Sequence, residues 1–272
     1  MTALTNPDTA TQELLERTQA GVLWITMNRP DSLNALTGTM IERLSVVLAD
    51  AAERDDVKVI VLTGAGRGFC AGGDVKAMAT GEGREETLEQ RSARLRRHMD
   101  SARLLHDMPK PTIAMARGAV AGAGLSLALA CDLLIASDTL KMTSAFVKVG
   151  LSGDFGSTYF LTQRIGHKAR ELALLSPKLT ADEALSLGLV NRVVPDGELE
   201  AATSAIAAQL AAGPGLAMGH IKANLNTAEQ GATLPEALDC EAWRHIRCGL
   251  TADHAEAASA FVEKRAPVFT NR

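Results

Sequence analysis

The spacing of apolar and polar residues predicts alternating strands and helices over the first two thirds of the chain. A run rich in β-branched residues at positions 57–63 is typical of a parallel strand that is buried on both faces. Positions 37–54 follow a helical period instead, with apolar side chains at Met40, Ile41, Leu44, Val47, Leu48 and Ala51. By the same reasoning we expect a long charged helix over 84–108 and further strands over 14–19, 22–27, 112–116 and 132–137.

Beyond about residue 195 the pattern becomes helical throughout. The alternation before that point predicts an α/β fold with right-handed crossovers. We therefore divide the chain into a flexible leader over 1–13, an α/β core over 14–195 and a helical C-terminal segment over 196–272. The last segment is expected to lie on the core or on a neighbouring subunit, with helices over 199–212, 216–228, 234–250 and 252–264.

Composition narrows the class of protein. The 272 residues are 46% hydrophobic and carry a net charge of −4, which argues against a nucleic-acid binder. The first 17 residues contain no long apolar stretch, so we expect neither a signal peptide nor a membrane span, and a cytoplasmic location. The four cysteines form no Cys-x-x-Cys pair, which disfavours a disulfide framework.

One group of residues invites a metal-site interpretation. Cys240, His245, Cys248 and His254 are close in sequence, and both residue types bind zinc. On a continuous helix, however, they fall near about 0°, 140°, 80° and 320°, which is too dispersed for one coordination sphere. We therefore predict no metal site.

The stretch that we expect to organise the chain is 116–132, where a strand leads through a glycine-alanine turn into an apolar helix. Small residues at Gly122 and Gly124 allow another backbone or a ligand to come close. The first amides of a helix have no partner within that helix, and the positive end of its dipole lies behind them. The turn therefore predicts a donor site for an oxyanion.

A second glycine-rich stretch, 64–74, follows the strand over 57–63. A dinucleotide-binding loop is the obvious alternative interpretation, and it would indicate a nucleotide-dependent dehydrogenase. That fingerprint requires a third glycine where Phe69 stands and a helix that opens at once, whereas another glycine turn comes first. The dehydrogenase remains the alternative from a different class of enzyme.

Taken together, the motifs resemble those of the crotonase superfamily, the enoyl-CoA hydratase/isomerase family. They are WITMNRP with NAL at 24–36, GFCAGGD at 68–74, the turn and helix at 118–132, the stretch 179–193 and AFVEKR at 260–265. The resemblance implies a spiral of ββα units, a C-terminal helical segment that assembles a homotrimer or hexamer, and an acyl-CoA thioester as ligand. Coenzyme A is then part of the substrate, and no separate cofactor is expected.

The resemblance also implies site residues. Two main-chain amides, which fall on Gly73 and Ala123, would stabilise the enolate oxygen of the thioester, as preorganised donors do in a site without competing water. Phe261 and Lys264 occupy places from which the terminal helix reaches the coenzyme of a neighbouring subunit. The remaining residues expected to line the ligand are Ala71, Gly72, Asp74, Val75, Gly122, Gly124, Ser126 and Phe146.

Three positions bear on the reaction. Hydratases of this family use two glutamates to position and activate water, and Ser126 and Phe146 stand at those places. Asp154 matches the catalytic aspartate of the family's isomerases, and we expect burial beside Phe146 and Phe155 to raise its pKa. A carboxylate there can take a proton from one carbon and return it to another. The alternative role for Asp154 is to cap the helix that begins near Gly156.

We therefore expect an acyl-CoA isomerase that shifts a double bond or rearranges the acyl skeleton, with Asp154 as acid and base. An enoyl-CoA hydratase or acyl-CoA hydrolase with an atypical base is the first alternative, and a non-catalytic acyl-CoA-binding protein is the second. His98 is a weaker candidate for the acyl pocket, since its charged helix favours an exposed side chain. Ser126 could contact substrate, although a serine in an apolar helix usually bonds to its own backbone.

Overall fold

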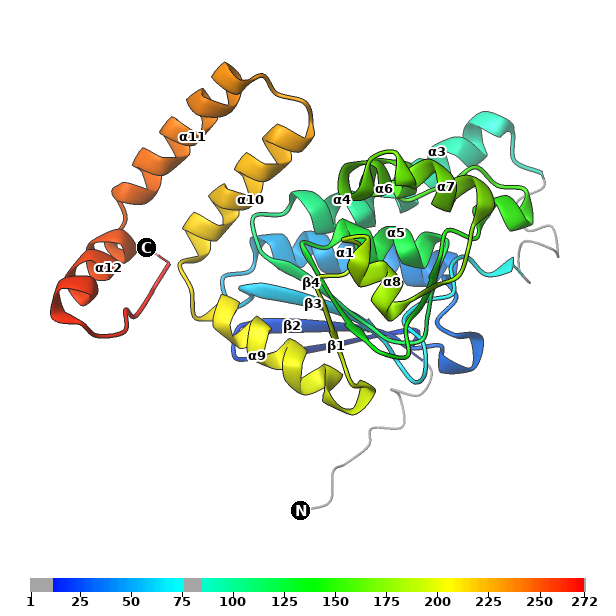
Figure 1. The fold of residues 1–272 in the computed structure, drawn as a ribbon, viewed down its shortest axis with the longest axis horizontal. Helices are drawn as coiled ribbons and strands as arrows, with labels where there is room; N and C mark the ends of the chain where they lie inside the picture. Colours follow the sequence, from blue (N-terminus) through cyan, green and yellow to red (C-terminus); the bar gives the residue numbers. More distant parts are fainter. Residues whose placement is uncertain (1–11, 76–84, 272) are drawn as a thin grey trace, which may run out of the picture.

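Six strands form the larger of two sheets, in the order β1-β2-β3-β4-β6-β9 (Figure 1). The structure, a computed structural model, describes residues 12–75 and 85–271, so most of the expected leader over 1–13 lies outside the described residues. The first two strands pair antiparallel and the others run parallel. The strands are β1 (Leu14–Gln19), β2 (Val22–Met27), β3 (Val59–Gly64), β4 (Thr112–Ala116), β6 (Leu133–Ser137) and β9 (Arg192–Val194).

A second sheet is built from very short strands. It contains β5 (Ala119–Ala121), β7 (Lys141–Thr143) and β8 (Leu179–Thr180), and Cys70 extends it by a bridge to Val120. At β4 and at β6 the chain thus runs from a long strand to a short one and then to a helix, which is the expected α/β arrangement of ββα units. The sequence did not predict these strands, because two or three residues are too few to show an alternating pattern.

The large sheet is covered on both faces (Figure 1). Ile60 and Leu62 face the core beneath helix α1, whereas Val59 and Val61 face the core beneath helix α9. β3 is therefore buried on both sides, as predicted. The six apolar positions predicted for the helix over 37–54 are the buried residues of α1. The helices that pack around the sheets, apart from the two described in the next paragraph, are α1 (Gly38–Glu53), α5 (Ala123–Ala130), α6 (Ser157–Ile165), α7 (Lys168–Leu175), α8 (Ala181–Ser186) and α9 (Leu199–Ala211). The short 3₁₀ helices are η2 (Pro30–Ser32), η3 (Phe146–Val149) and η4 (Asp196–Glu198).

The prediction of one long helix over 84–108 was wrong. Two helices occupy this stretch, α3 (Leu88–His98) and α4 (Asp100–Asp107), and they are separated at Met99; residue 84 lies outside the described residues. A capping box formed by Thr87 and Gln90 starts α3. No residue of α3 is fully buried, whereas α4 turns Ala102 and Leu105 into the core. The break at Met99 allows only the second helix to pack.

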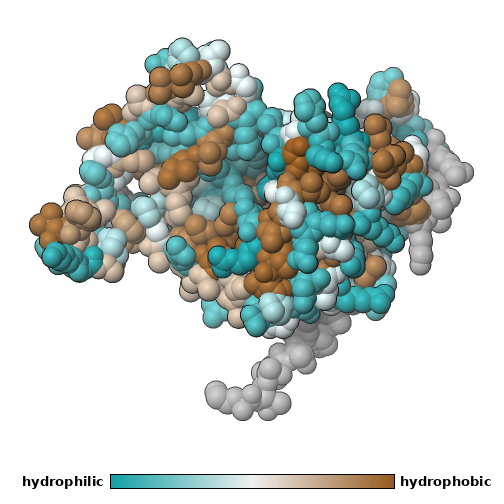
Figure 2. Space-filling view, viewed as in Figure 1, coloured by the Kyte–Doolittle hydropathy of each residue, from teal (hydrophilic) through white to brown (hydrophobic). Residues whose placement is uncertain are grey.

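Three helices form an arm that projects from the core: α10 (Gly215–Glu229), α11 (Leu234–Gly249) and α12 (Ala252–Glu263) (Figure 1). Lys222 of α10 joins the arm to the core. Its buried ammonium group donates to the Asp132 carboxylate at 2.9 Å and to two main-chain carbonyls. Apolar patches run along the arm (Figure 2), and its exposed side chains include Ile221, Leu225, Leu234, Leu238, Trp243, Ile246, Leu250, Phe261 and Val262. None of the described helices is long and apolar enough to cross a bilayer.

Candidate active site

The two glycine-rich stretches lie side by side. The Cys70 amide donates to the Ala119 carbonyl at 3.0 Å, and the Ala121 amide donates to the Cys70 carbonyl at 2.9 Å. This pairing places Ala71, which follows the bridge, alongside the turn that starts α5. It also explains Gly124, because a Cβ atom there would lie only 2.5 Å from the Cys70 carbonyl oxygen.

Gly72 and Gly122 form a second point of close approach between the two stretches. Both have positive φ, 100° and 54° respectively, which few other residues adopt. A Cβ atom on Gly72 would lie 3.1 Å from the Ala121 carbonyl oxygen, and one on Gly122 would lie 3.6 Å from the Gly72 Cα atom. The same position on Gly122 is 3.9 Å from the ring of Phe146, which is buried. Phe146 therefore forms an apolar wall beside the turn.

The amides of Gly73 and Ala123 have no acceptor among the described residues. The Leu36 amide donates to the Gly72 carbonyl, and the Asp74 amide donates to the Leu36 carbonyl. Leu36 thus pairs in parallel with Gly73, and in such a pairing the N–H of Gly73 points away from Leu36. The Ala123 amide is the first of α5, where no intrahelical acceptor exists. The structure thus brings together two segments that each present one unpaired main-chain donor.

Arg29 holds the residue that follows Gly73. Its guanidinium group donates to the Asp74 carboxylate at 3.0 Å and to the Ala35 carbonyl at 2.6 Å, and it lies 3.2 Å from the Glu13 carboxylate. The group is about three quarters buried, so the pair is shielded from solvent. Charge-assisted hydrogen bonds of this kind are stronger than neutral ones. Arg29 therefore fixes the end of the turn that carries one donor.

Asn34 holds the beginning of the same glycine-rich stretch. Its side-chain amide donates to the Ala65 and Gly68 carbonyls at 2.9 and 2.8 Å, and its oxygen accepts from the Arg29 amide at 2.9 Å. In the sequence, Arg29 and Asn34 stand only as parts of a motif, with no predicted role. The signal for Asn34 lies in the structure: the residue is fully buried, and a buried asparagine requires partners for both ends of its amide.

Asp154 lies in the loop between η3 and α6. Its Oδ1 atom is buried and has no hydrogen-bond partner among the described residues. Burial disfavours the charged form and raises the pKa of the carboxyl to about 6, the direction expected from the sequence. The capping alternative was wrong: Gly156 is the N-cap of α6, and Asp154 contributes only its main-chain carbonyl, which accepts from the Ser157 amide at 3.0 Å.

Ser126 joins α5 to this loop. Its hydroxyl lies 3.0 Å from the main-chain oxygen of Asp154 and 3.3 Å from that of Gly122, one turn earlier in the helix. The back-bond expected for a serine in an apolar helix is therefore present, but the contact to Asp154 is shorter. Because Ala123 lies one turn from Ser126, Asp154 is brought to the same end of the helix as one of the two donors.

Two of the expected ligand residues, Phe261 and Lys264, lie outside this turn within one chain. Phe261 lies in the last turn of α12, Lys264 is the C-cap of that helix, and both are exposed. α12 forms the outer end of the arm, away from α5 (Figure 1). One chain therefore does not bring them to the turn that holds Gly73 and Ala123. Val75 is exposed at the edge of the described turn, immediately before residues that lie outside the description.

His98 is not the exposed side chain that its charged helix suggested. Only 11% of the side chain is accessible, and its Nε2 atom lies 3.6 Å from the Glu42 carboxylate of α1. The sequence prediction was wrong because α1 covers this end of α3, a tertiary contact that local charge does not reveal.

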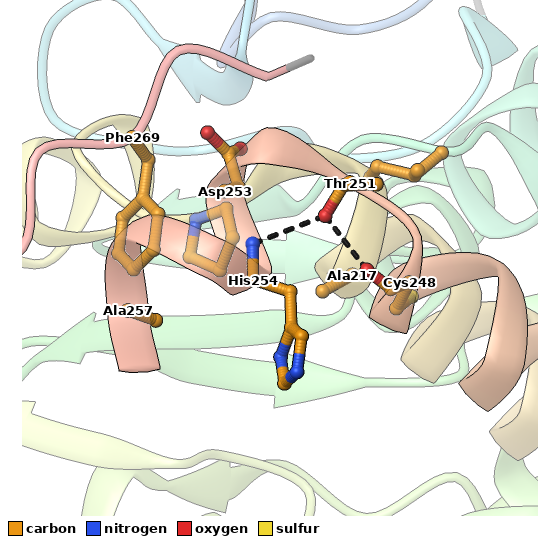
Figure 3. Close-up of a pocket in the computed structure, with 9 residues that line it drawn as sticks. Ala217, Cys248, Thr251, Asp253, His254, Ala257 and Phe269 are labelled. Atoms are coloured by element: carbon orange, nitrogen blue, oxygen red, sulfur yellow. Dashed lines mark hydrogen bonds between the residues drawn. The ribbon is translucent and has the colours of Figure 1, made fainter. Parts of the chain in front are cut away.

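A hollow of about 160 Å³ lies within the arm, apart from the residues above (Figure 3). Most of its lining is apolar. Thr251 accepts from the His254 amide at 3.1 Å and so caps α12. Asp253 accepts from the Thr270 and Asn271 amides and thereby ties down the C-terminal tail. These polar groups are thus engaged in local structure, and within residues 12–75 and 85–271 no group of three potential metal ligands is found.

Known proteins share both the sequence pattern and the fold. A sequence model described as enoyl-CoA hydratase/isomerase matches residues 17–272. A probable enoyl-CoA hydratase of Rhodobacter capsulatus is 37% identical over 93% of this chain and 95% of its own. The 1,2-epoxyphenylacetyl-CoA isomerase of Escherichia coli K12 is 36% identical over 95% of this chain and 98% of its own. A crystal structure of a putative enoyl-CoA hydratase from Streptomyces coelicolor covers 100% of both chains with a TM-score of 0.90 and 35% identity, which confirms the crotonase-like fold.

Proposed function

The chain belongs to the enoyl-CoA hydratase/isomerase family, and from that premise we propose that it isomerises an acyl-CoA thioester with Asp154 as acid and base. The reaction would shift a double bond or rearrange the acyl skeleton. The observation that carries this proposal is the Asp154 carboxyl, whose Oδ1 atom is buried with no hydrogen-bond partner in the described part of the chain and whose pKa is raised to about 6. Such a group can both accept and return a proton near neutral pH.

The thioester carbonyl oxygen would accept from the amides of Gly73 and Ala123. Negative charge develops on this oxygen when a proton leaves the neighbouring carbon, and fixed donors lower the barrier because they need not reorient. Losing one such donor typically raises the barrier by about 2.7–4 kcal/mol. Since both donors are main-chain groups, their positions depend on contacts that hold the main chain, such as that of Arg29 with the residue after Gly73.

Asp154 would then move the proton. Its carboxylate removes a proton from one carbon to give the enolate, and the resulting carboxylic acid returns the proton to a carbon further along the conjugated system. No water is consumed, and the atoms of product and substrate are the same. Ser126 and Phe146 occupy the positions of the glutamates of hydratases, so neither position offers a second carboxylate to activate water.

The named relatives support two reactions. The Escherichia coli relative is named an isomerase, which favours the isomerase proposal, and the Rhodobacter capsulatus relative is named a probable hydratase. The second candidate function is therefore hydration of an enoyl-CoA with a base other than the usual glutamates. The name of the Rhodobacter capsulatus relative is the specific support for hydration, whereas the Asp154 carboxyl supports isomerisation.

We further propose that the arm assembles a homotrimer, or a hexamer of two trimers, and that Phe261 and Lys264 contact coenzyme A bound to the neighbouring subunit. The support is the exposure of Phe261 and of the apolar side chains along α10 and α11. A lysine at that position can pair with a phosphate group. Sedimentation of the full chain, together with the affinity of Phe261→Ala for a CoA ester, tests both statements.

The experiment that tests the reaction uses three substrates in heavy water. The purified protein is incubated with a 3-enoyl-CoA, a 2-enoyl-CoA and a saturated acyl-CoA, and deuterium incorporation and products are followed. We expect isomerisation in the native protein, its loss in Asp154→Asn, and no loss in the control Asp55→Asn, which changes an exposed loop residue. Hydration that persists in Asp154→Asn contradicts the proposal, and CoA-ester binding without exchange indicates a non-catalytic binding protein.

A further inference from the structure

We propose that Ser126 is a positioning residue that fixes Asp154 relative to the main-chain donors, an inference that rests on the proposed function. All eight residues of α5 are buried, and Ser126 carries the one polar side chain among them. A buried hydroxyl requires a hydrogen-bond partner. It finds its nearer acceptor, at 3.0 Å, in the Asp154 main-chain carbonyl, 28 residues further along the chain.

The Asp154 carbonyl is held from two sides. The hydroxyl of Ser126 donates to it from α5, and the Ser157 amide donates to it from α6, both at 3.0 Å. The residues on either side of Asp154 have positive φ, 118° at Gly153 and 48° at Phe155. Glycine adopts such values freely, but a phenylalanine in this region is strained and persists there only where the surroundings hold it. The two hydrogen bonds to the Asp154 carbonyl supply that restraint, because Asp154 lies between Gly153 and Phe155.

The side chain of Asp154 has no comparable restraint. Its Oδ1 atom has no partner among the described residues, so no hydrogen bond to that atom fixes where the oxygen points. The position of the carboxyl therefore depends on where the main chain of Asp154 is held. Ser126 holds it from the helix whose first amide, at Ala123, is one of the two proposed donors. One hydroxyl thus couples the acid–base group to the donor.

Removing the hydroxyl should affect the chemical step more than substrate binding. In Ser126→Ala we expect the kcat for isomerisation, measured as deuterium transfer in single turnovers, to fall about 10-fold to 100-fold, since a displacement of about 1 Å can lower a rate 100-fold. The KM for the acyl-CoA should change less than about 2-fold, because the Ser126 hydroxyl is engaged with main-chain oxygens of the protein itself. Ser126→Thr retains a hydroxyl and should recover most of the rate.

The acidic limb of the rate profile is a second readout. A displaced Asp154 carboxyl gains access to water, so its pKa should fall and the limb should move to lower pH in Ser126→Ala. Ser101→Ala is the matched control: that serine is also fully buried and its hydroxyl also donates to a main-chain carbonyl, that of His98. It should leave kcat and the acidic limb unchanged.

The outcomes separate the inference from the function on which it rests. If Asp154→Asn isomerises normally, the proposed function is wrong and the inference falls with it. If Asp154→Asn is inactive while Ser126→Ala keeps the native kcat and pH profile, the function stands and only the positioning role is overturned. Equal loss in Ser126→Ala and Ser101→Ala, with the acidic limb unmoved in both, likewise overturns it, because a general effect of buried serines then suffices.

Discussion

The guanidinium group of Arg29 donates to the carboxylate of Asp74 at 3.0 Å, across 45 residues of sequence. The contact joins the end of β2 to the residue immediately after Gly73, so it sets the direction of the Gly73 amide through one peptide unit. Both side chains are largely shielded from water, which strengthens the pair relative to a surface ion pair.

Replacing Arg29 should therefore impair the oxyanion site without touching substrate. We expect Arg29→Met to lower kcat about 10-fold to 100-fold, because a small displacement of a donor has a large effect on rate. Arg29→Lys should be intermediate, since an ammonium group cannot reproduce the guanidinium fork. Steady-state kinetics measure both. Arg43→Met removes an exposed pair with Glu16 and should leave kcat unchanged; an equal loss there would argue against a specific role for Arg29.

The pH dependence of activity should report the ionisation of Asp154. As a base, the carboxyl must be deprotonated in the free enzyme, and burial raises its pKa to about 6. We expect kcat/KM to rise about tenfold per pH unit below pH 6 and to level off above it. Initial rates between pH 4.5 and 8 measure the profile. A profile without an acidic limb in this range would show that another group supplies the base.

The same carboxyl should destabilise the folded protein at neutral pH. Its pKa is raised from 3.8 to about 6 on folding, so the folded state binds the proton more tightly than the unfolded chain does. Stability therefore falls as pH rises from 3.8 to about 6 and does not change further from this group above that range. Asp154→Asn should accordingly be more stable than the native protein by roughly 2 kcal/mol at pH 8, after allowance for partial exposure.

Below pH 3.8 the difference should vanish, because the carboxyl is protonated in both the folded and the unfolded state. Urea denaturation of the two proteins at pH 8 and at the lowest pH where both fold measures the change. A difference of the same size at both values would indicate a packing effect of asparagine rather than the removal of a charge.

The attachment of the arm to the core, and with it the stability of the protein, should depend on Lys222. Its side chain is 8% accessible and donates to Asp132 and to the Leu105 and Lys110 carbonyls. Lys222→Met should lower the free energy of unfolding by roughly 3 kcal/mol, near the lower end for breaking a buried pair, because the Asp132 carboxylate keeps some contact with water. Chemical denaturation measures this. Lys168→Met removes an exposed pair with Glu171, and its expected effect is less than about 0.5 kcal/mol.

Local pattern was sufficient to predict the long elements of the fold. The period of α1 identified its buried face, and the β-branched run of β3 indicated burial on both sides. The second sheet was missed because its strands are too short to carry a pattern. The break at Met99 was missed because the charged periodicity continues across it, and only packing of α4 against the core distinguishes the two halves.

The sequence predicted many of the residues that form the candidate site, but it did not predict which of them contact one another. Glycines that permit close approach are visible in the sequence, and so is an aspartate in an apolar loop. The pairing of Ser126 with Asp154, or of Arg29 with Asp74, depends on how distant segments are brought together, which neither local periodicity nor charge encodes. The role that the resemblance implies for Phe261 and Lys264, toward the coenzyme of a neighbouring subunit, likewise depends on contacts between chains and stays a prediction.

The main-chain character of the two proposed donors has an evolutionary consequence. Every amino acid except proline carries an amide N–H, so point mutation at Gly73 or Ala123 can displace a donor but seldom delete it. Acid–base chemistry, in contrast, depends on single side chains such as Asp154. A lineage with this scaffold can therefore change its reaction through a few codons while it inherits the capacity to activate a thioester.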